Sequence, residues 1–253
     1  MDLFDSICLG IIQGLTEFLP ISSSGHLVLG QSVLGINQPG NEFEILVHMG
    51  TLASIIYVFF NDIKNIIFSL HTRETKRFIL FIIIGTLPAV IIGISLKETI
   101  KSFFENLFVV GVSLTFTGLI LFTSSYFKSF NNRFNYLNAF IIGLVQAIAI
   151  IPGISRSGMT ISCALFLGIN PKNAARFSFF LAIPVITGAG LLMALDINND
   201  FHIEIPVAIG GFISSFFIGI LSLKWLIGWL QNGKFHYFGV YCLLAGLLTI
   251  YLQ

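Results

Sequence analysis

The chain has 253 residues, of which 55% are hydrophobic and 10% are charged, and its mean hydropathy is +0.92. Soluble globular domains carry about 25% charged residues, so this composition excludes an ordinary soluble domain and indicates a protein that crosses a membrane several times. The net charge of +1 offers no basic surface for nucleic acid, and we expect no nucleic-acid partner.

Apolar segments of two lengths follow one another along the chain. A spanning helix needs about 20 apolar residues, whereas stretches of about 10–14 are more typical of re-entrant or interfacial segments. The short segments cover residues 6–19, 25–35, 138–151 and 159–168. The long segments cover residues 44–60, 78–96, 107–127, 174–195, 205–227 and 237–252.

The order of these segments, short, short, long, long, long, occurs twice. A re-entrant pair returns the chain to the side it entered from, and three spans then carry it across, so the second copy enters from the opposite face. Five crossings per copy would also invert it, and the segment lengths favour re-entrance. We expect an all-α integral membrane protein with six spanning helices, two re-entrant pairs and an inverted-topology repeat. One domain, 1–253, would then hold repeats of about 1–130 and 131–253.

Each re-entrant pair contains a related break. Residues 10–25, GIIQGLTEFLPISSSG, align without a gap with residues 143–158, GLVQAIAIIPGISRSG. Both stretches are apolar runs that stop at proline and serine and then resume. Broken helices at corresponding places in two halves point to a binding site near the middle of the bilayer.

Positive charges give the orientation. The side opposite the N-terminus receives ten lysines and arginines: Lys64, Arg73, Lys76, Arg77, Lys128, Arg133, Lys172, Arg176, Lys224 and Lys234. The N-terminal side receives Lys97 and Lys101. Because cytoplasmic loops carry the excess of lysine and arginine, we expect both termini and the first broken pair to face outside.

Five ionisable residues fall at membrane depth: Glu17, His26, Glu44, His48 and Arg156. Such a charge costs about 2.5–3.5 kcal/mol at the bilayer centre on insertion scales, so it persists where it pairs, lines water or takes part in function. Glu17 and Arg156 lie in the breaks, which favours function. Glu44 and His48 begin a span, where tying helices together or reaching the interface is an equally good explanation.

The serines and threonine of the breaks suit an anion. Ser22, Ser24, Ser155, Ser157 and Thr160 lie where half-helices begin, and a helix N-terminus presents free N–H groups and a positive dipole. Simple N-capping is the plainer role for any one of them. Two such termini would nevertheless form a cradle for a phosphate group.

Arg156 can clamp a phosphate in this cradle, but Glu17 is wrong for anion binding alone. A carboxylate beside a phosphate implies a bridging metal ion or a general base. Gln13 lies four residues before Glu17, on the same helix face. With a serine nucleophile and a histidine, the set predicts phosphoryl hydrolysis of a lipid-linked substrate. A flippase or other transporter of a lipid carrier is the alternative.

Two signature stretches, QGLTEFLPISSSGH at 13–26 and PGISRSGMT at 152–160, resemble those of the bacterial undecaprenyl-diphosphate phosphatases, the bacitracin-resistance family. FEILVHMGTLAS at 43–54 and FSFFLAIP at 177–184 extend the resemblance over the whole chain. The resemblance implies a multi-pass enzyme of the bacterial plasma (inner) membrane. It would convert undecaprenyl diphosphate to the monophosphate and inorganic phosphate, recycling the carrier for cell-wall synthesis. A homodimer is left open.

The resemblance also implies roles for individual residues. Glu17 would be the essential acid, Ser23 the candidate nucleophile, His26 an acid/base or the rival nucleophile, and Arg156 the phosphate clamp. Ser22, Ser24, Ser155, Ser157 and Thr160 would bind phosphate, and Gln13 and Glu44 would support the site. The expected cofactor is a divalent cation, Mg²⁺ or Ca²⁺, with Glu17 as its tentative ligand. Gln13 supplies no charge to it.

Overall fold

The computed structural model describes residues 1–36, 42–124, 126–127, 134–196 and 203–252, and every regular element in these ranges is a helix. The helices of the first half are α1 (Leu3–Thr16), α2 (Ser23–Val33), α3 (Glu42–Val58), α4 (Phe60–Phe68), α5 (Arg73–Ser95), α6 (Lys97–Phe104) and α7 (Leu107–Ser124). Those of the second half are α8 (Tyr136–Ile148), α9 (Arg156–Phe166), α10 (Pro171–Asp196), α11 (Ile205–Gln231) and α12 (His236–Tyr251).

The all-α membrane class is confirmed, with fewer clear spans than expected. Four helices are long and apolar enough to cross a membrane: α5, α7, α10 as far as Leu192, and α11. The predicted span 44–60 ends early, because α3 stops at Val58 and the chain bends by 68° into α4. Counting this bent pair gives a fifth span, and α12, with 16 residues, is shorter than the others.

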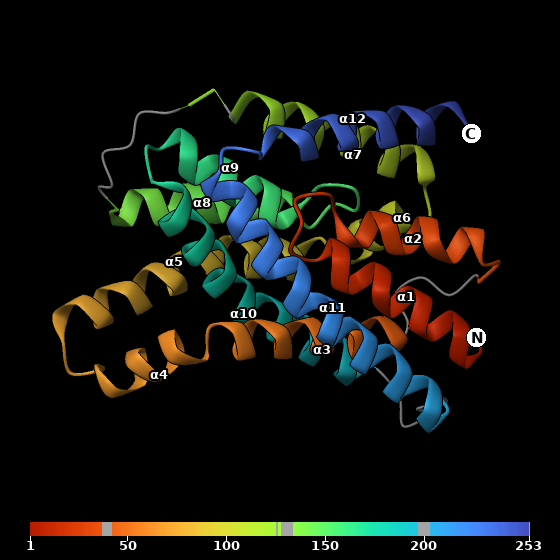
Figure 1. The fold of residues 1–253 in the computed structure, drawn as a ribbon, viewed down its shortest axis with the longest axis horizontal. Helices are drawn as coiled ribbons and strands as arrows, with labels where there is room; N and C mark the ends of the chain where they lie inside the picture. The colour runs from red at the N-terminus through yellow and green to blue at the C-terminus, as the bar shows by residue number, and fades with distance from the viewer. Residues whose placement is uncertain (37–41, 125, 128–133, 197–202, 253) are drawn as a thin grey trace.

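Two short helices were not predicted. α4 and α6 have nine and eight residues, and each mixes apolar with charged side chains. Such amphipathic helices suit a membrane–water interface, and a search for long apolar runs passes over them. In Figure 1, α4 lies at one end of the longest axis, whereas α6 and both chain termini lie toward the other end.

Helices of the two halves pack against one another. α1 packs along α11 and α8 along α5, while α3 packs on α10 and α7 on α12. The α7–α12 pair, which runs along one edge of Figure 1, is close because glycines meet there. A Cβ added at Gly118 would lie 2.8 Å from the Gly239 carbonyl oxygen. Small residues allow this close approach, the usual basis of helix association in membranes.

The first helix break is embedded in the main apolar core. Phe18 is fully buried, and its ring meets that of Phe179 edge to face, with centroids 5.9 Å apart. Leu19 and Ile21 belong to the same buried cluster. Irregular backbone at membrane depth is tolerated where protein surrounds it, so this packing fixes the polar side chains that the break carries.

Candidate active site

The first break turns the chain from α1 into α2. Pro20 follows α1, and Ser22 adopts φ +71°, a left-handed conformation that is uncommon for residues other than glycine. Ser22 Oγ accepts a hydrogen bond from the N–H of Gly25, at 3.3 Å, and thereby caps α2. A strained residue that the surrounding structure holds in place is typical of functional sites.

The second break repeats this capping from α8 into α9. Gly153 adopts φ +90°, and Ser155 Oγ accepts from the N–H of Gly158 at 3.1 Å. The hydroxyl of Ser155 lies 3.3 Å from that of Ser157, as that of Ser22 lies 3.3 Å from that of Ser24. The matched sequences therefore form matched caps.

The two breaks interlock. The N–H of Gly153 donates to Ser22 Oγ at 3.1 Å, and Ser157 Oγ donates to the Leu19 carbonyl at 3.3 Å. From α7, Thr117 Oγ1 accepts from the N–H of Ser155 at 3.1 Å and donates to the Gly153 carbonyl at the same distance. The half-helices that the sequence places 133 residues apart, 23 against 156, thus begin side by side.

Glu17 lies at the centre of this junction, with its side chain 6% exposed. Arg156 Nη2 donates to Oε1 at 2.5 Å. Oε2 accepts from Ser23 Oγ at 2.6 Å and from Gln13 Nε2 at 3.1 Å. One carboxylate therefore joins a serine of its own half to the arginine of the other, and the face that Gln13 and Glu17 were predicted to share is real.

Three buried side-chain atoms of the site have no hydrogen-bond partner among the described residues. They are Arg156 Nη1, Gln13 Oε1 and Gln146 Oε1. A buried donor without a partner is costly, and the second nitrogen of a guanidinium is well placed to bind an oxyanion. Arg156 therefore holds Glu17 with one nitrogen, while its second nitrogen has no protein partner among the described residues.

A cavity of about 230 Å³ opens beside these groups, and its lining combines polar with apolar side chains; we call it the polar cavity because the polar site residues line it. Six of the predicted site residues line it: Glu17, Ser22, Ser23, Ser24, Ser155 and Arg156. Ser157 and Thr160 do not line it. Thr160 instead donates to the Arg156 carbonyl at 2.8 Å and contacts Ser178 at 2.7 Å, so it acts in the packing of α9 on α10.

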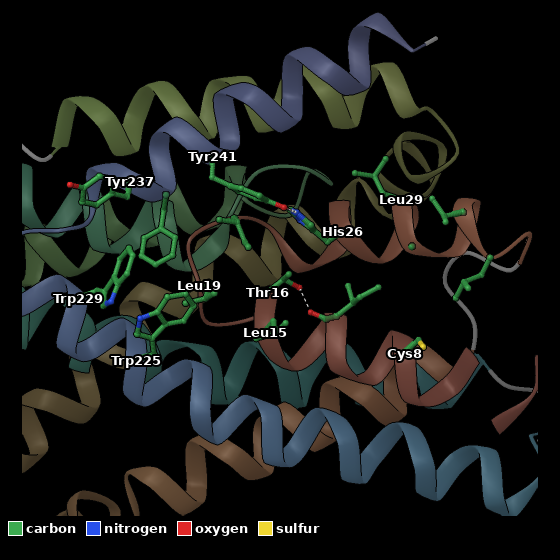
Figure 2. Close-up of a pocket in the computed structure, with 16 residues that line it drawn as sticks. Cys8, Leu15, Thr16, Leu19, His26, Leu29, Trp225, Trp229, Tyr237 and Tyr241 are labelled. Atoms are coloured by element: carbon green, nitrogen blue, oxygen red, sulfur yellow. Dashed lines mark hydrogen bonds between the residues drawn. The ribbon is translucent and has the colours of Figure 1, made fainter. Parts of the chain in front are cut away.

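His26 does not line the polar cavity; it lines an apolar pocket of about 720 Å³ between α1, α2, α11 and α12 (Figure 2). Its Nδ1 lies 2.8 Å from the Ser22 carbonyl oxygen, and its Nε2 lies 2.7 Å from the Tyr241 hydroxyl. A carbonyl oxygen only accepts, so Nδ1 is the donor. Both ring nitrogens are engaged, and the imidazole does not reach the carboxylate in this arrangement.

His48 of α3 is the histidine that faces Glu17, and it was not among the predicted site residues. Its Nε2 lies 3.8 Å from Glu17 Oε2, and it lines the polar cavity. Glu44, one turn earlier, contacts Gln31 at 3.3 Å and does not line the cavity. Gln146, the repeat partner of Gln13, also lines it. Two features of the sequence could have identified these residues: His48 is ionisable at membrane depth, and Gln146 occupies the repeat position of Gln13.

Among the described residues, the side chains around Glu17 do not by themselves fit a resident divalent cation. Within the described ranges, no three His, Cys, Asp or Glu side chains come together as a metal site would require. Both oxygens of Glu17 already accept hydrogen bonds, one of them from a guanidinium. A need for Mg²⁺ or Ca²⁺ stays a prediction from the resemblance.

The fold and this junction define a multi-pass helical membrane protein built around two interlocked helix breaks, with one carboxylate and one guanidinium between them. The chain belongs to the bacitracin resistance protein BacA family, whose model matches residues 6–248. The two signature stretches predicted this membership.

Curated relatives match the chain over its whole length. The undecaprenyl-diphosphatase of Christiangramia forsetii is 42% identical over 99% of this chain and 98% of its own. That of Methanosphaera stadtmanae is 40% identical over 100% and 99%. Undecaprenyl-diphosphatase 1 of Bacillus cereus is 39% identical over 96% and 95%.

Proposed function

We propose that this protein hydrolyses undecaprenyl diphosphate to undecaprenyl phosphate and inorganic phosphate, as a phosphoric anhydride hydrolase. The name that the relatives carry gives the substrate. The observation that carries the chemistry is the contact of Ser23 Oγ with Glu17 Oε2 at 2.6 Å, next to an arginine with a free buried nitrogen. The product is the lipid carrier in the form that cell-wall synthesis uses again.

In the first step the terminal phosphoryl group moves to Ser23. Glu17 takes the hydroxyl proton as Ser23 Oγ attacks the terminal phosphorus, and the P–O bond to the bridging oxygen breaks. The proton then passes from Glu17 to the departing phosphate oxygen. Arg156 Nη1 binds the charge on the equatorial oxygens, which is the main task in phosphoryl transfer.

In the second step water releases the phosphate. Glu17, again a carboxylate, takes a proton from the attacking water, the new P–O bond forms, and the bond from phosphorus to Ser23 Oγ breaks. Glu17 returns the proton to Oγ, which restores the serine. The caps around Ser22 and Ser155 supply the positive ends of α2 and α9 to the same group.

The test is phosphate release by the purified full-length chain in detergent with undecaprenyl diphosphate. We expect turnover of the wild-type protein and a large loss in Arg156→Ala. In vesicles, translocation of the lipid without phosphate release would instead favour the alternative, a transporter. Transport alone would not need the hydrogen bond between Ser23 and Glu17, so hydrolysis is the function that the site supports best.

We further infer an inverted-topology repeat of six crossing segments, with α1–α2 and α8–α9 as re-entrant pairs. The reciprocal packing supports this relation, since α1 packs on α11 as α8 packs on α5, and α7 and α12 pair with each other. The bent α3–α4 pair and the 16-residue α12 then complete the six. One continuous membrane domain is the simplest description of such interleaved halves.

Both termini and the site would face the outside of the plasma membrane. Arg73, Lys76 and Arg77 begin α5 beside α4, at the opposite end of the longest axis from both termini and α6 (Figure 1). Lys128 and Arg133, which also entered the charge count, lie outside the described residues. The positive end would be cytoplasmic.

Cysteine labelling tests this orientation. In a variant with Cys8, Cys163 and Cys242 replaced by serine, we expect Glu98→Cys to react with an impermeant maleimide in intact cells. Lys76→Cys should react only after the membrane is opened. The cysteine-free parent is the control, and the reverse pattern would place the termini and the site in the cytoplasm.

A further inference from the structure

We propose that His48 is a further catalytic residue, whose Nε2 binds an oxygen of the phosphoryl group that Ser23 attacks. The proposal rests on the hydrolysis proposed above and adds a contact from α3, an element outside both helix breaks. It thereby assigns a role to the histidine that the structure places in the polar cavity.

The imidazole of His48 is held in one orientation. Nδ1 lies 2.7 Å from the Glu44 carbonyl oxygen, one turn earlier in α3. A carbonyl oxygen accepts only, so Nδ1 donates its hydrogen there and Nε2 is directed away from its own helix. The side chain is 30% exposed, against 6% for Glu17, so a ligand entering the cavity can reach it.

His48 and Ser23 lie against the same oxygen of Glu17. Ser23 Oγ is 2.6 Å from Oε2 and His48 Nε2 is 3.8 Å from it, whereas Arg156 contacts Oε1. A phosphorus atom in line for attack lies about 3–3.5 Å from the serine oxygen. Ser23, His48 and Arg156 all line the same cavity, so a phosphoryl group in this position can present one oxygen to His48 Nε2 and another to Arg156 Nη1.

His48 and Glu17 are close to each other but do not form a hydrogen bond. At 3.8 Å the two atoms are too far apart for a hydrogen bond. Within the described part of the chain, the hydrogen bond recorded for the His48 ring is the one through Nδ1. Nε2 therefore keeps its bonding capacity for a third group, and when the ring is protonated a phosphoryl oxygen receives a charge-assisted hydrogen bond.

The experiment compares His48→Gln with His48→Leu in the full-length protein, measuring phosphate release and its inhibition by inorganic phosphate. Glutamine offers an N–H donor at this position, whereas leucine has similar bulk and no polar atom. We expect His48→Leu to lose kcat/KM about tenfold to a hundredfold and to bind inorganic phosphate more weakly by a similar factor. His48→Gln should retain most of both. His71→Leu, a change at an exposed histidine, is the matched control.

Other results would contradict the proposed contact between His48 and the phosphoryl group. Wild-type kcat/KM in His48→Leu, or a loss of rate with unchanged phosphate inhibition, overturns the contact with the phosphoryl group. If His48→Leu does not fold, we expect the same losses in His48→Asn. The asparagine side chain is shorter and its amide does not extend to the position of the His48 Nε2. Absence of phosphate release from the wild-type protein would reject the hydrolysis itself, which is a different result from equal rates in wild type and variant.

Discussion

Replacing Glu17 by glutamine should slow phosphate release about a thousandfold or more, within the range that general acid–base groups contribute. Glutamine preserves the size of the side chain but cannot take the Ser23 proton. It also leaves Arg156 without the carboxylate that it contacts at 2.5 Å. Breaking one partner of a buried ion pair costs about 3–5 kcal/mol of stability, so the rate is compared per folded protein after size-exclusion chromatography.

Asp62→Asn is the matched control for this loss. Asp62 also pairs with an arginine, Arg176, at 3.1 Å, but these side chains are 43% and 39% exposed. Exposed pairs contribute about 0–1 kcal/mol, so the same carboxylate-to-amide change should leave rate and folding unaltered. If Glu17→Gln kept even a tenth of the wild-type rate, the role of Glu17 as the proton acceptor would be wrong.

Ser23→Ala should abolish the covalent intermediate as well as turnover. With substrate labelled in the terminal phosphate, rapid acid quenching of the wild-type enzyme should leave label on the protein as acid-stable phosphoserine. The variant should carry none, and its rate should fall about a thousandfold or more, as for nucleophiles that act together with a base. Ser32→Ala, at an exposed serine of the same helix, should behave as wild type.

A double variant sharpens the assignment of this pair. Because Ser23 and Glu17 would act as one unit, Ser23→Ala combined with Glu17→Gln should be hardly slower than either alone. Multiplicative losses would mean that the two residues act independently, which contradicts the proposed proton transfer. If Ser23→Ala retained label after a quench in base and lost it on acidification, the nucleophile would be reassigned to a histidine, such as His26.

The sequence predicted the elements that depend on run length and composition. The short segments were recognised because their apolar runs stop at Pro20 and Pro152, and the structure ends α1 and α8 close to these positions. The bend after α3 was missed because apolar residues continue through Phe59 and Phe60. Run length measures hydrophobicity along the chain and carries no information about a change in direction.

The candidate site was predicted unevenly for a similar reason. The repeat identified Glu17 and Arg156, since unmatched charges in matched sequences stand out. The repeat did not point to His48, and the resemblance placed His26 in the site instead. The direction of His26 depends on the φ of +71° at Ser22 and on Tyr241, 215 residues away. Contacts of this kind arise only when distant segments pack, and local spacing does not encode them.

The interlocking of the two breaks has a consequence for how the protein is made. Glu17 leaves the ribosome 139 residues before Arg156, and the Gly153 N–H that bonds to Ser22 Oγ follows Ser22 by 131 residues. Until the second half has been made, Glu17 lacks the guanidinium that is its counter-ion, and an unpaired carboxylate is costly at membrane depth. We therefore expect the nascent first half to have no phosphatase activity. The groups proposed to act together come into contact only once the second half has been made.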